Sequence, residues 1–124
     1  MSVLVTGGAG FIGSSLVRSL AGDGLAVRVL DDFSTGRPEN LEGVAGDLEV
    51  LEGDVRDPAT VAKAVTGAEV VYHLAALPSV ARSVADPRAS HEVNVDGTLN
   101  LLLAAVDAEV RRLVYASSLS LIHI

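Results

Sequence analysis

Residues 3–13 read Val3-Leu4-Val5-Thr6-Gly7-Gly8-Ala9-Gly10-Phe11-Ile12-Gly13, an apolar run that leads directly into a glycine-rich turn. The glycines fit the spacing GxGxxG through Gly8, Gly10 and Gly13, and more loosely through Gly7, Gly10 and Gly13. A buried strand that turns at once into a helix carrying a pyrophosphate needs glycine wherever a Cβ would clash. The sequence therefore predicts a dinucleotide-binding turn.

The residues after the turn distinguish this motif from the phosphate-binding loop of nucleotide triphosphatases. Gly8 and Gly13 have the separation of GxxxxGK[ST], but Ser14 stands where that loop has its lysine. Without this ammonium group nothing reaches the β and γ phosphates, so hydrolysis of ATP or GTP is set aside. Helical spacing predicts one apolar helix face made of Phe11, Ile12, Leu16 and Leu20.

An acidic residue stands at the distance expected of a ribose ligand. Residues 26–30 read as a strand, and Asp31 follows it, 18 residues after Gly13. A carboxylate there accepts hydrogen bonds from the adenosine ribose and repels a 2′-phosphate, which favours NAD over NADP. Capping of a turn is the alternative for Asp31 and the favoured role of Asp32. Arg37 leaves NADP open, because a guanidinium nearby can accept the phosphate.

Strand and helix signals alternate along the chain. Strands are predicted at residues 3–5, 26–30, 48–52, 70–74 and 113–116. A short helix is predicted at 38–41, and another begins at Asp57-Pro58 and stops at Gly67. The longest helix carries one apolar stripe, made of Val95, Leu99, Leu102, Leu103 and Val106. The alternation predicts an α/β Rossmann fold, incomplete here, whose doubly wound parallel sheet has the order 3-2-1-4-5.

The composition narrows the classes of function. At 124 residues and 49% hydrophobic content, the chain is one domain with a globular core. A net charge of −7 argues against sequence-independent binding to nucleic acid or to an anionic membrane. The absence of cysteine excludes disulfides and thiolate chemistry. Because no signal peptide or membrane-spanning run is visible, we expect a cytoplasmic protein.

In a doubly wound sheet the ligand lies over the carboxyl ends of the strands. Each predicted strand is followed there by a candidate contact: residues 7–13, Asp31, Asp54, Leu74 to Ala76, and Ser117 with Ser118. Any one of them has a structural explanation as a turn, a tight packing position or a strand-end polar group. Their convergence on one rim favours a ligand site.

Six motifs in this order resemble the extended short-chain dehydrogenase/reductase family, in particular NAD-dependent nucleotide-sugar epimerases and dehydratases. They are TGGAGFIG, DDFSTG, GDVRD, HLAA, NVDGT and YASS, and the similarity covers residues 1–118. It is greatest to UDP-hexose and UDP-N-acetylhexosamine 4-epimerases, in the stretch Pro78-Ser79-Val80 with Arg82-Ser83.

This resemblance implies a role for each matching position. The pyrophosphate turn is formed by Gly7, Gly10, Phe11, Ile12 and Gly13. The ribose acid is Asp31, and the adenine side is lined by Asp32, Phe33, Ser34, Thr35 and Gly36. The adenine edge is held by Asp54 and Val55. The nicotinamide half is bordered by Leu74, Ala75, Ala76 and Ser117. Asn94 steadies the strand-four loop or the cofactor, Ser118 bonds the reacting sugar oxygen, and Ser79 contacts the substrate.

The reaction implied by the resemblance is epimerisation of a nucleotide sugar. A tyrosine takes the sugar O4 proton while hydride passes from C4 to NAD⁺ and then returns to the other face. The alternatives are a nucleotide-sugar 4,6-dehydratase, a UDP-glucuronate decarboxylase, and a non-catalytic NAD-sensing module. Relatives are often dimers, so a homodimer is expected.

The family's YxxxK pair follows the serine motif, and this sequence has no such pair, since Lys63 is its only lysine. Residues 119–124, Leu-Ser-Leu-Ile-His-Ile, resemble the translation of a sequencing adaptor. We therefore expect residues 1–118 to be the N-terminal, NAD-binding part of a longer enzyme and 119–124 to be a non-native tail. Such a fragment is expected to lack turnover, and its fifth strand to leave an unpaired apolar edge.

Two histidines have structural rather than catalytic interpretations. His73 lies in an apolar strand and is predicted to be a hydrogen-bonded core imidazole, while His91 is predicted on a helix surface. No group of histidines and carboxylates has metal-ligand spacing, so no metal is expected.

Overall fold

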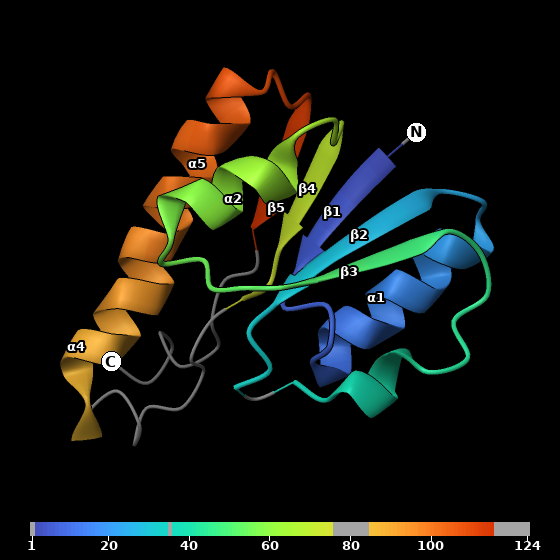
Figure 1. The fold of residues 1–124 in the computed structure, drawn as a ribbon, viewed down its shortest axis with the longest axis horizontal. Coiled ribbons are helices and arrows are strands. Elements are labelled where there is room, and N and C mark those ends of the chain that lie inside the picture. The colour runs from blue at the N-terminus through green and yellow to red at the C-terminus, as the bar shows by residue number, and fades with distance from the viewer. Residues whose placement is uncertain (1, 35, 76–84, 116–124) are drawn as a thin grey trace.

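The computed structural model describes residues 2–34, 36–75 and 85–115, and its centre is a five-stranded parallel sheet (Figure 1). The strands are β1 (Ser2–Thr6), β2 (Ala26–Asp31), β3 (Leu48–Glu52), β4 (Val70–His73) and β5 (Arg112–Tyr115). Their order in the sheet is β3-β2-β1-β4-β5. This confirms the predicted order, and the strand bounds agree with the predicted ones to within a residue at each described end.

Helices cover both faces of the sheet, as Figure 1 shows. One face carries α1 (Phe11–Gly22) and the 3₁₀ turn η1 (Pro38–Leu41). The other carries α2 (Pro58–Val65) and a long helical segment made of α4 (Pro87–His91), the π-helical η2 (Glu92–Asp96) and α5 (Gly97–Asp107). None of the helices in the described ranges has the length and apolarity needed to cross a membrane.

Each face of the sheet has its own hydrophobic core, because side chains alternate along a strand. In β1, Leu4 belongs to the core under α2 and α5, with Val61, Val65 and Leu101. Its neighbours Val3 and Val5 belong to the core under α1, together with Val17, Val27 and Val29. Strands buried on both faces explain the near-continuous apolar runs of the sequence.

The cap predicted for the 58–65 helix is present. Asp57 accepts a hydrogen bond from the Ala59 N–H at 3.1 Å and one from the Thr60 hydroxyl at 2.8 Å. Gly67, at φ +80°, follows the helix in the left-handed region that favours glycine. Local turn residues therefore set both ends of α2.

The apolar stripe predicted on the longest helix does not face the core. Its five residues are 45–76% exposed, and they are Val95, Leu99, Leu102, Leu103 and Val106. The buried positions are Val93, Gly97, Leu101 and Ala105. Helix α5 is apolar on more than one side, so periodicity alone does not identify the packed face. The sheet side takes Gly97 because a Cβ there would lie 2.6 Å from a Val55 methyl carbon.

The apolar face predicted for the first helix is also partly wrong. Phe11 is 87% exposed and Ile12 is 72% exposed, whereas Leu20 is buried. The side of α1 that packs on the sheet is formed by Gly13, Ser14, Val17, Leu20 and Ala21. Phe11 and Ile12 form the first turn of the helix, directly after the glycine turn.

Candidate dinucleotide-binding site

The glycine turn between β1 and α1 is held by backbone hydrogen bonds within the turn and to β2. The Gly7 N–H donates to the Leu30 carbonyl at 2.8 Å, and the Gly10 N–H donates to the Gly7 carbonyl at 3.1 Å. Gly7 has φ +69°, and a Cβ on it would lie 2.9 Å from the Ala75 nitrogen. A Cβ on Gly13 would collide with the Gly7 carbonyl oxygen. Backbone geometry thus requires glycine at positions 7 and 13 of the looser triplet.

Gly8 has a different reason to be glycine, since a Cβ there would lie 2.8 Å from the methyl groups of Val29. It packs the turn onto β2. At the start of α1, Gly10 is the N-cap and no side chain caps the helix. The amides of the first helical turn have no partner further back within the helix. A diphosphate is the kind of group that such a helix start accepts.

Asp31 lies at the end of β2 and holds the glycine turn. One carboxylate oxygen, Oδ2, accepts the Ala9 N–H at 2.9 Å, and Oδ1 accepts the Phe33 N–H at 2.8 Å. The residue is only 7% exposed. Gly36 packs against this contact, because a Cβ on it would lie 2.9 Å from Oδ2. Each oxygen keeps a further lone pair for a ligand.

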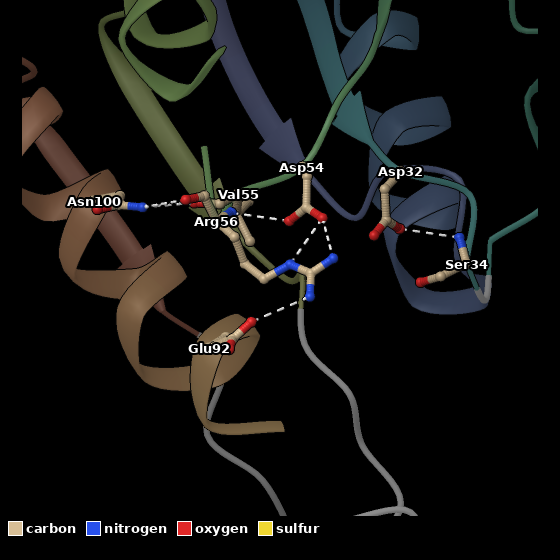
Figure 2. Close-up of polar contacts among 7 residues, drawn as sticks. All are labelled: Asp32, Ser34, Asp54, Val55, Arg56, Glu92 and Asn100. Atoms are coloured by element: carbon tan, nitrogen blue, oxygen red, sulfur yellow. Dashed lines mark hydrogen bonds and ion pairs between the residues drawn. The ribbon is translucent and has the colours of Figure 1, made fainter. Parts of the chain in front are cut away.

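Asp32 and Ser34 form the next turn, in which Asp32 Oδ1 accepts the Ser34 N–H at 3.0 Å (Figure 2). The turn-capping role predicted for Asp32 is therefore present. Phe33 between them has φ +60°. The adenine-side stretch is a tight turn set by two consecutive aspartates.

Asn40 is a site residue that sequence reasoning missed. Its side-chain Nδ2 donates to the Ala9 carbonyl oxygen at 2.7 Å, and the Arg37 N–H donates to the same oxygen at 3.0 Å. Arg18 on α1 holds η1 in turn, donating to the carbonyls of Asn40 at 2.8 Å and Glu42 at 2.9 Å. The Ala9 carbonyl is therefore bonded by Asn40 and Arg37, and its N–H is bonded by Asp31. No local pattern marks Asn40.

The loop after β3 is organised around Asp54 (Figure 2). Its Oδ1 accepts the Arg56 N–H at 2.9 Å, and its Oδ2 accepts Nε of the same guanidinium at 2.9 Å and Nη2 at 2.6 Å. These hydrogen bonds from the Arg56 side chain hold the pKa of Asp54 below its usual value. Arg56 Nη1 also reaches Glu92 of η2 at 3.4 Å. Asp54 is therefore an ionised, oriented carboxylate at the rim.

Helix α5 also contacts the loop after β3, through the side chain of Asn100. Asn100 Nδ2 donates to the carbonyl oxygens of Val55 at 3.0 Å and Arg56 at 3.2 Å. Val55 is 5% exposed and packs where Gly97 lets the helix approach. Residues from two distant elements therefore position the predicted adenine edge.

His73 at the end of β4 joins the last residue of β1 to helix α5. Thr6 Oγ1 accepts from the Leu74 and Ala75 N–H groups, both at 3.1 Å, so its own proton points at His73 Nδ1, 2.7 Å away. The proton of the ring then lies on Nε2, which donates to Thr98 Oγ1 at 2.9 Å. Burial lowers the pKa of His73 to about 4. The predicted core imidazole is confirmed and is neutral.

The structure brings most of the predicted site residues to the carboxyl end of the sheet. Described there are Gly7, Gly10, Phe11, Ile12, Gly13, Asp31, Asp32, Phe33, Ser34, Gly36, Asp54, Val55, Leu74 and Ala75. Asn94 lies in η2, where its backbone carbonyl accepts the Thr98 hydroxyl at 2.8 Å. The remaining predicted residues lie outside the described ranges and are Thr35, Ala76, Ser79, Ser117 and Ser118.

Two other sequence expectations concern charged and metal-binding groups. His91 lies on the surface, with its Nε2 3.6 Å from Asp96, as predicted. Across residues 2–34, 36–75 and 85–115, no group of three or more histidines, aspartates or glutamates is arranged to hold a metal ion.

Comparison with known proteins finds long, continuous similarity. A UDP-glucose 4-epimerase of Mycolicibacterium smegmatis is 48% identical over 121 residues, which cover 95% of this chain and 39% of that protein. A 3 beta-hydroxysteroid dehydrogenase/Delta 5→4-isomerase of Mycobacterium tuberculosis is 44% identical over 124 residues, covering 97% of this chain and 32% of that protein. The chain thus spans well under half the length of these relatives.

A solved structure shares the fold. The UDP-glucose 4-epimerase of Thermus thermophilus, in complex with NAD, superposes with a TM-score of 0.86 at 45% identity, over 94% of this chain and 37% of that one. The sequence profile of the NAD dependent epimerase/dehydratase family matches residues 3–122. With its glycine turn, strand-end acids and sheet order, this chain belongs to the NAD-dependent epimerase/dehydratase family.

Proposed function

We propose that the carboxyl rim of this sheet binds NAD. The fit is supported by the turn itself, in which a Cβ at Gly7 or Gly13 would occupy space against backbone atoms, and by the uncapped start of α1. In this proposal Asp31 accepts from the adenosine ribose with its remaining lone pairs. Asp54 and Val55 meet the adenine edge, and Leu74 and Ala75 border the nicotinamide half.

The single observation that carries the proposal is the Ala9–Asp31 hydrogen bond of 2.9 Å. It joins the diphosphate turn to the strand-end acid, so the two groups that grip the cofactor are held in one geometry. A carboxylate at this position favours NAD over NADP because it repels a 2′-phosphate. The Arg37 backbone N–H donates to the Ala9 carbonyl, and among the described residues no ion pair or hydrogen bond joins the Arg37 side chain to Asp31.

We further propose that a protein carrying this segment, continued as its relatives are, epimerises a UDP-sugar at C4. Support comes from the 48% identity to a UDP-glucose 4-epimerase and from the NAD complex of the Thermus relative. When bound, the cofactor supplies a reversible hydride acceptor. The role of this chain is to bind and orient it, while Ser118 directs the reacting sugar oxygen and Ser79 contacts the sugar nucleotide.

We also propose the extent of the cofactor-binding unit, the location of the protein and its oligomeric state. Residues 1–118 form the cofactor-binding unit, and residues 119–124 add nothing to it. The protein acts in the cytoplasm. In the complete enzyme a homodimer forms, and the exposed apolar side of α5 is available for burial in it.

Calorimetric titration of the 124-residue protein with NAD⁺ and NADP⁺ tests the cofactor assignment. We expect NAD⁺ to bind more tightly, and Asp31→Ala to weaken it about tenfold or more, since both the turn and the ribose contact are lost. An affinity for NAD⁺ that is indifferent to Asp31→Ala overturns the proposal. A chain ending at Ser118 serves as the matched control and should bind as well as the 124-residue protein.

The reaction is tested with the full-length protein. Interconversion of UDP-glucose and UDP-galactose supports the epimerase. Loss of water from a nucleotide sugar, or of CO₂ from UDP-glucuronate, would assign the dehydratase or decarboxylase instead. The fourth substrate to test is a 3β-hydroxysteroid, because a relative at 44% identity is a 3 beta-hydroxysteroid dehydrogenase/Delta 5→4-isomerase.

A further inference from the structure

One peptide unit of the adenine-edge loop is held at both ends. It is the unit between Val55 and Arg56. Its N–H donates to Asp54 Oδ1 at 2.9 Å, and its carbonyl oxygen accepts Asn100 Nδ2 at 3.0 Å. The Asn100 amide also reaches the next carbonyl, that of Arg56, at 3.2 Å. Because a peptide unit is planar, fixing its carbonyl also fixes the direction of its N–H.

Asn100 therefore acts on Asp54 through this peptide. Figure 2 shows the sequence of contacts, from the Asn100 side chain on α5, through the loop backbone, to the Asp54 carboxylate. Asn100 and Val55 are 45 residues apart in the chain, so only the tertiary fold brings them together. A half-buried side-chain amide is well suited to this, since its two N–H groups can serve two carbonyls.

The other contacts of the loop leave one acceptor lone pair and one donor without a protein partner among the described residues. Asp54 Oδ2 accepts two hydrogen bonds from the Arg56 guanidinium, whereas Oδ1 accepts only the Arg56 N–H, so Oδ1 keeps a lone pair for a ligand. Within the described parts of the chain, no acceptor pairs with the Val55 N–H. An acceptor, Asp54 Oδ1, and a donor, the Val55 N–H, thus belong to adjacent residues, and they match the donor 6-amino group and the acceptor N1 of adenine.

We propose that Asn100 is a positioning residue that sets Asp54 and Val55 for adenine and so makes the site prefer an adenine dinucleotide to its hypoxanthine analogue. This rests on the proposed NAD site. Hypoxanthine carries a 6-oxo acceptor and an N1–H donor, the reverse of adenine. Its oxygen would face the Asp54 carboxylate, and its N1–H would face the Val55 N–H. A site built on hydrogen bonds rejects a ligand with the opposite pattern.

The test measures a ratio of affinities rather than one affinity. The 124-residue protein is titrated calorimetrically with NAD⁺, with nicotinamide hypoxanthine dinucleotide, and with nicotinamide mononucleotide, which has no base at this edge. Asn100→Asp keeps the shape of the side chain but removes both donors. We expect the wild type to prefer NAD⁺ by about tenfold, and Asn100→Asp to reduce that preference to about twofold or less.

Control variants separate positioning from loss of structure. Leu103→Ala on the exposed side of α5 should leave the ratio unchanged, and Asn100→Gln, which retains the amide, should restore part of it. Because Asn100 acts through Asp54, Asn100→Asp in an Asp54→Ala background should cause no further loss of preference. Asn100→Ala provides the same comparison if the aspartate variant does not fold, as judged by circular dichroism.

The failures of the two proposals are distinguishable. If both dinucleotides weaken equally in Asn100→Asp and the ratio is preserved, Asn100 supports the fold alone and this inference is overturned while the NAD site stands. If the folded wild type binds neither dinucleotide, the proposed function and the inference fall together.

Discussion

The side-chain amide of Asn40 donates a 2.7 Å hydrogen bond to the carbonyl oxygen of Ala9, in the middle of the glycine turn. The Ala9 N–H is held at the same time by Asp31. The turn that is proposed to carry the diphosphate is therefore fixed by residues of η1 and β2 rather than by its glycines alone. Glycine permits the required backbone conformation, and the hydrogen bonds from Asn40 and to Asp31 stabilise it.

Replacing Asn40 by alanine should loosen the turn without changing the charge near the phosphates. Loss of one neutral hydrogen bond, with the Arg37 N–H still in place, should weaken NAD⁺ binding about three- to tenfold. Calorimetry on the variant measures this. Glu39→Ala, an exposed change on the same 3₁₀ turn, is the control. Equal effects from the two variants would contradict a specific role for Asn40.

Two glycines of α1 should respond in opposite ways to alanine. A Cβ at Gly13 would collide with the Gly7 carbonyl oxygen, whereas one at Gly22 meets nothing within 4 Å. Gly13→Ala should cost about 1–3 kcal/mol of unfolding free energy and abolish measurable NAD⁺ binding. Gly22→Ala should be neutral or stabilising by up to about 1 kcal/mol. Urea titration and calorimetry compare them, and a fully stable, NAD-binding Gly13→Ala protein would refute the close approach.

His73 should make the protein acid-sensitive. Its pKa falls from 6.5 when unfolded to about 4 when buried in the fold. Between these values the unfolded chain binds a proton that the folded chain does not, so stability from this group is complete above about pH 6.5 and declines towards pH 4. The loss approaches about 3 kcal/mol.

Urea denaturation of the wild type and of His73→Gln at a series of pH values isolates this effect. The variant is expected to be less stable at neutral pH, because its partners Thr6 and Thr98 lose an imidazole between them. Its stability should nevertheless fall less steeply between pH 6.5 and pH 4. Parallel curves for the two proteins would show that His73 is not the titrating group.

The two sides of α5 should differ sharply in their contribution to stability. Leu101 is fully buried, while Leu103 is 58% exposed. Leu101→Ala should cost about 2–5 kcal/mol, whereas Leu103→Ala should change the free energy of unfolding by no more than about 0.5 kcal/mol. Chemical denaturation of both variants tests whether Leu101, and not the predicted stripe residue Leu103, lies on the packed side of α5.

Leu103 also bears on self-association. Leu103→Glu places a charge in the exposed apolar stripe, so sedimentation should show less self-association than the wild type if that stripe is buried between copies. Unchanged sedimentation would argue against the proposed use of this surface in the homodimer.

Much of the site could be predicted because its signals are local. The glycine spacing, the acid after the second strand and the Asp57 cap each depend on residues close together in the chain. Asn40 and Asn100 carry no such signal, since their acceptors lie 31 and 45 residues away. A single asparagine in a helical stretch is uninformative until the fold brings a carbonyl to it.

The sequence by itself determined the kind and order of the elements, the parallel sheet and the edge at which the candidate contacts gather. Hydrophobic period, turn residues and the right-handed crossover are sufficient for these, because each operates between neighbours in the chain. Tertiary structure alone decided which side of α5 meets the sheet, and which backbone carbonyls Asn40 and Asn100 hold. Those choices depend on close packing between distant segments, as at Gly97, where a Cβ would lie 2.6 Å from a Val55 methyl carbon. Residues that are neighbours in the sequence do not predict such a contact.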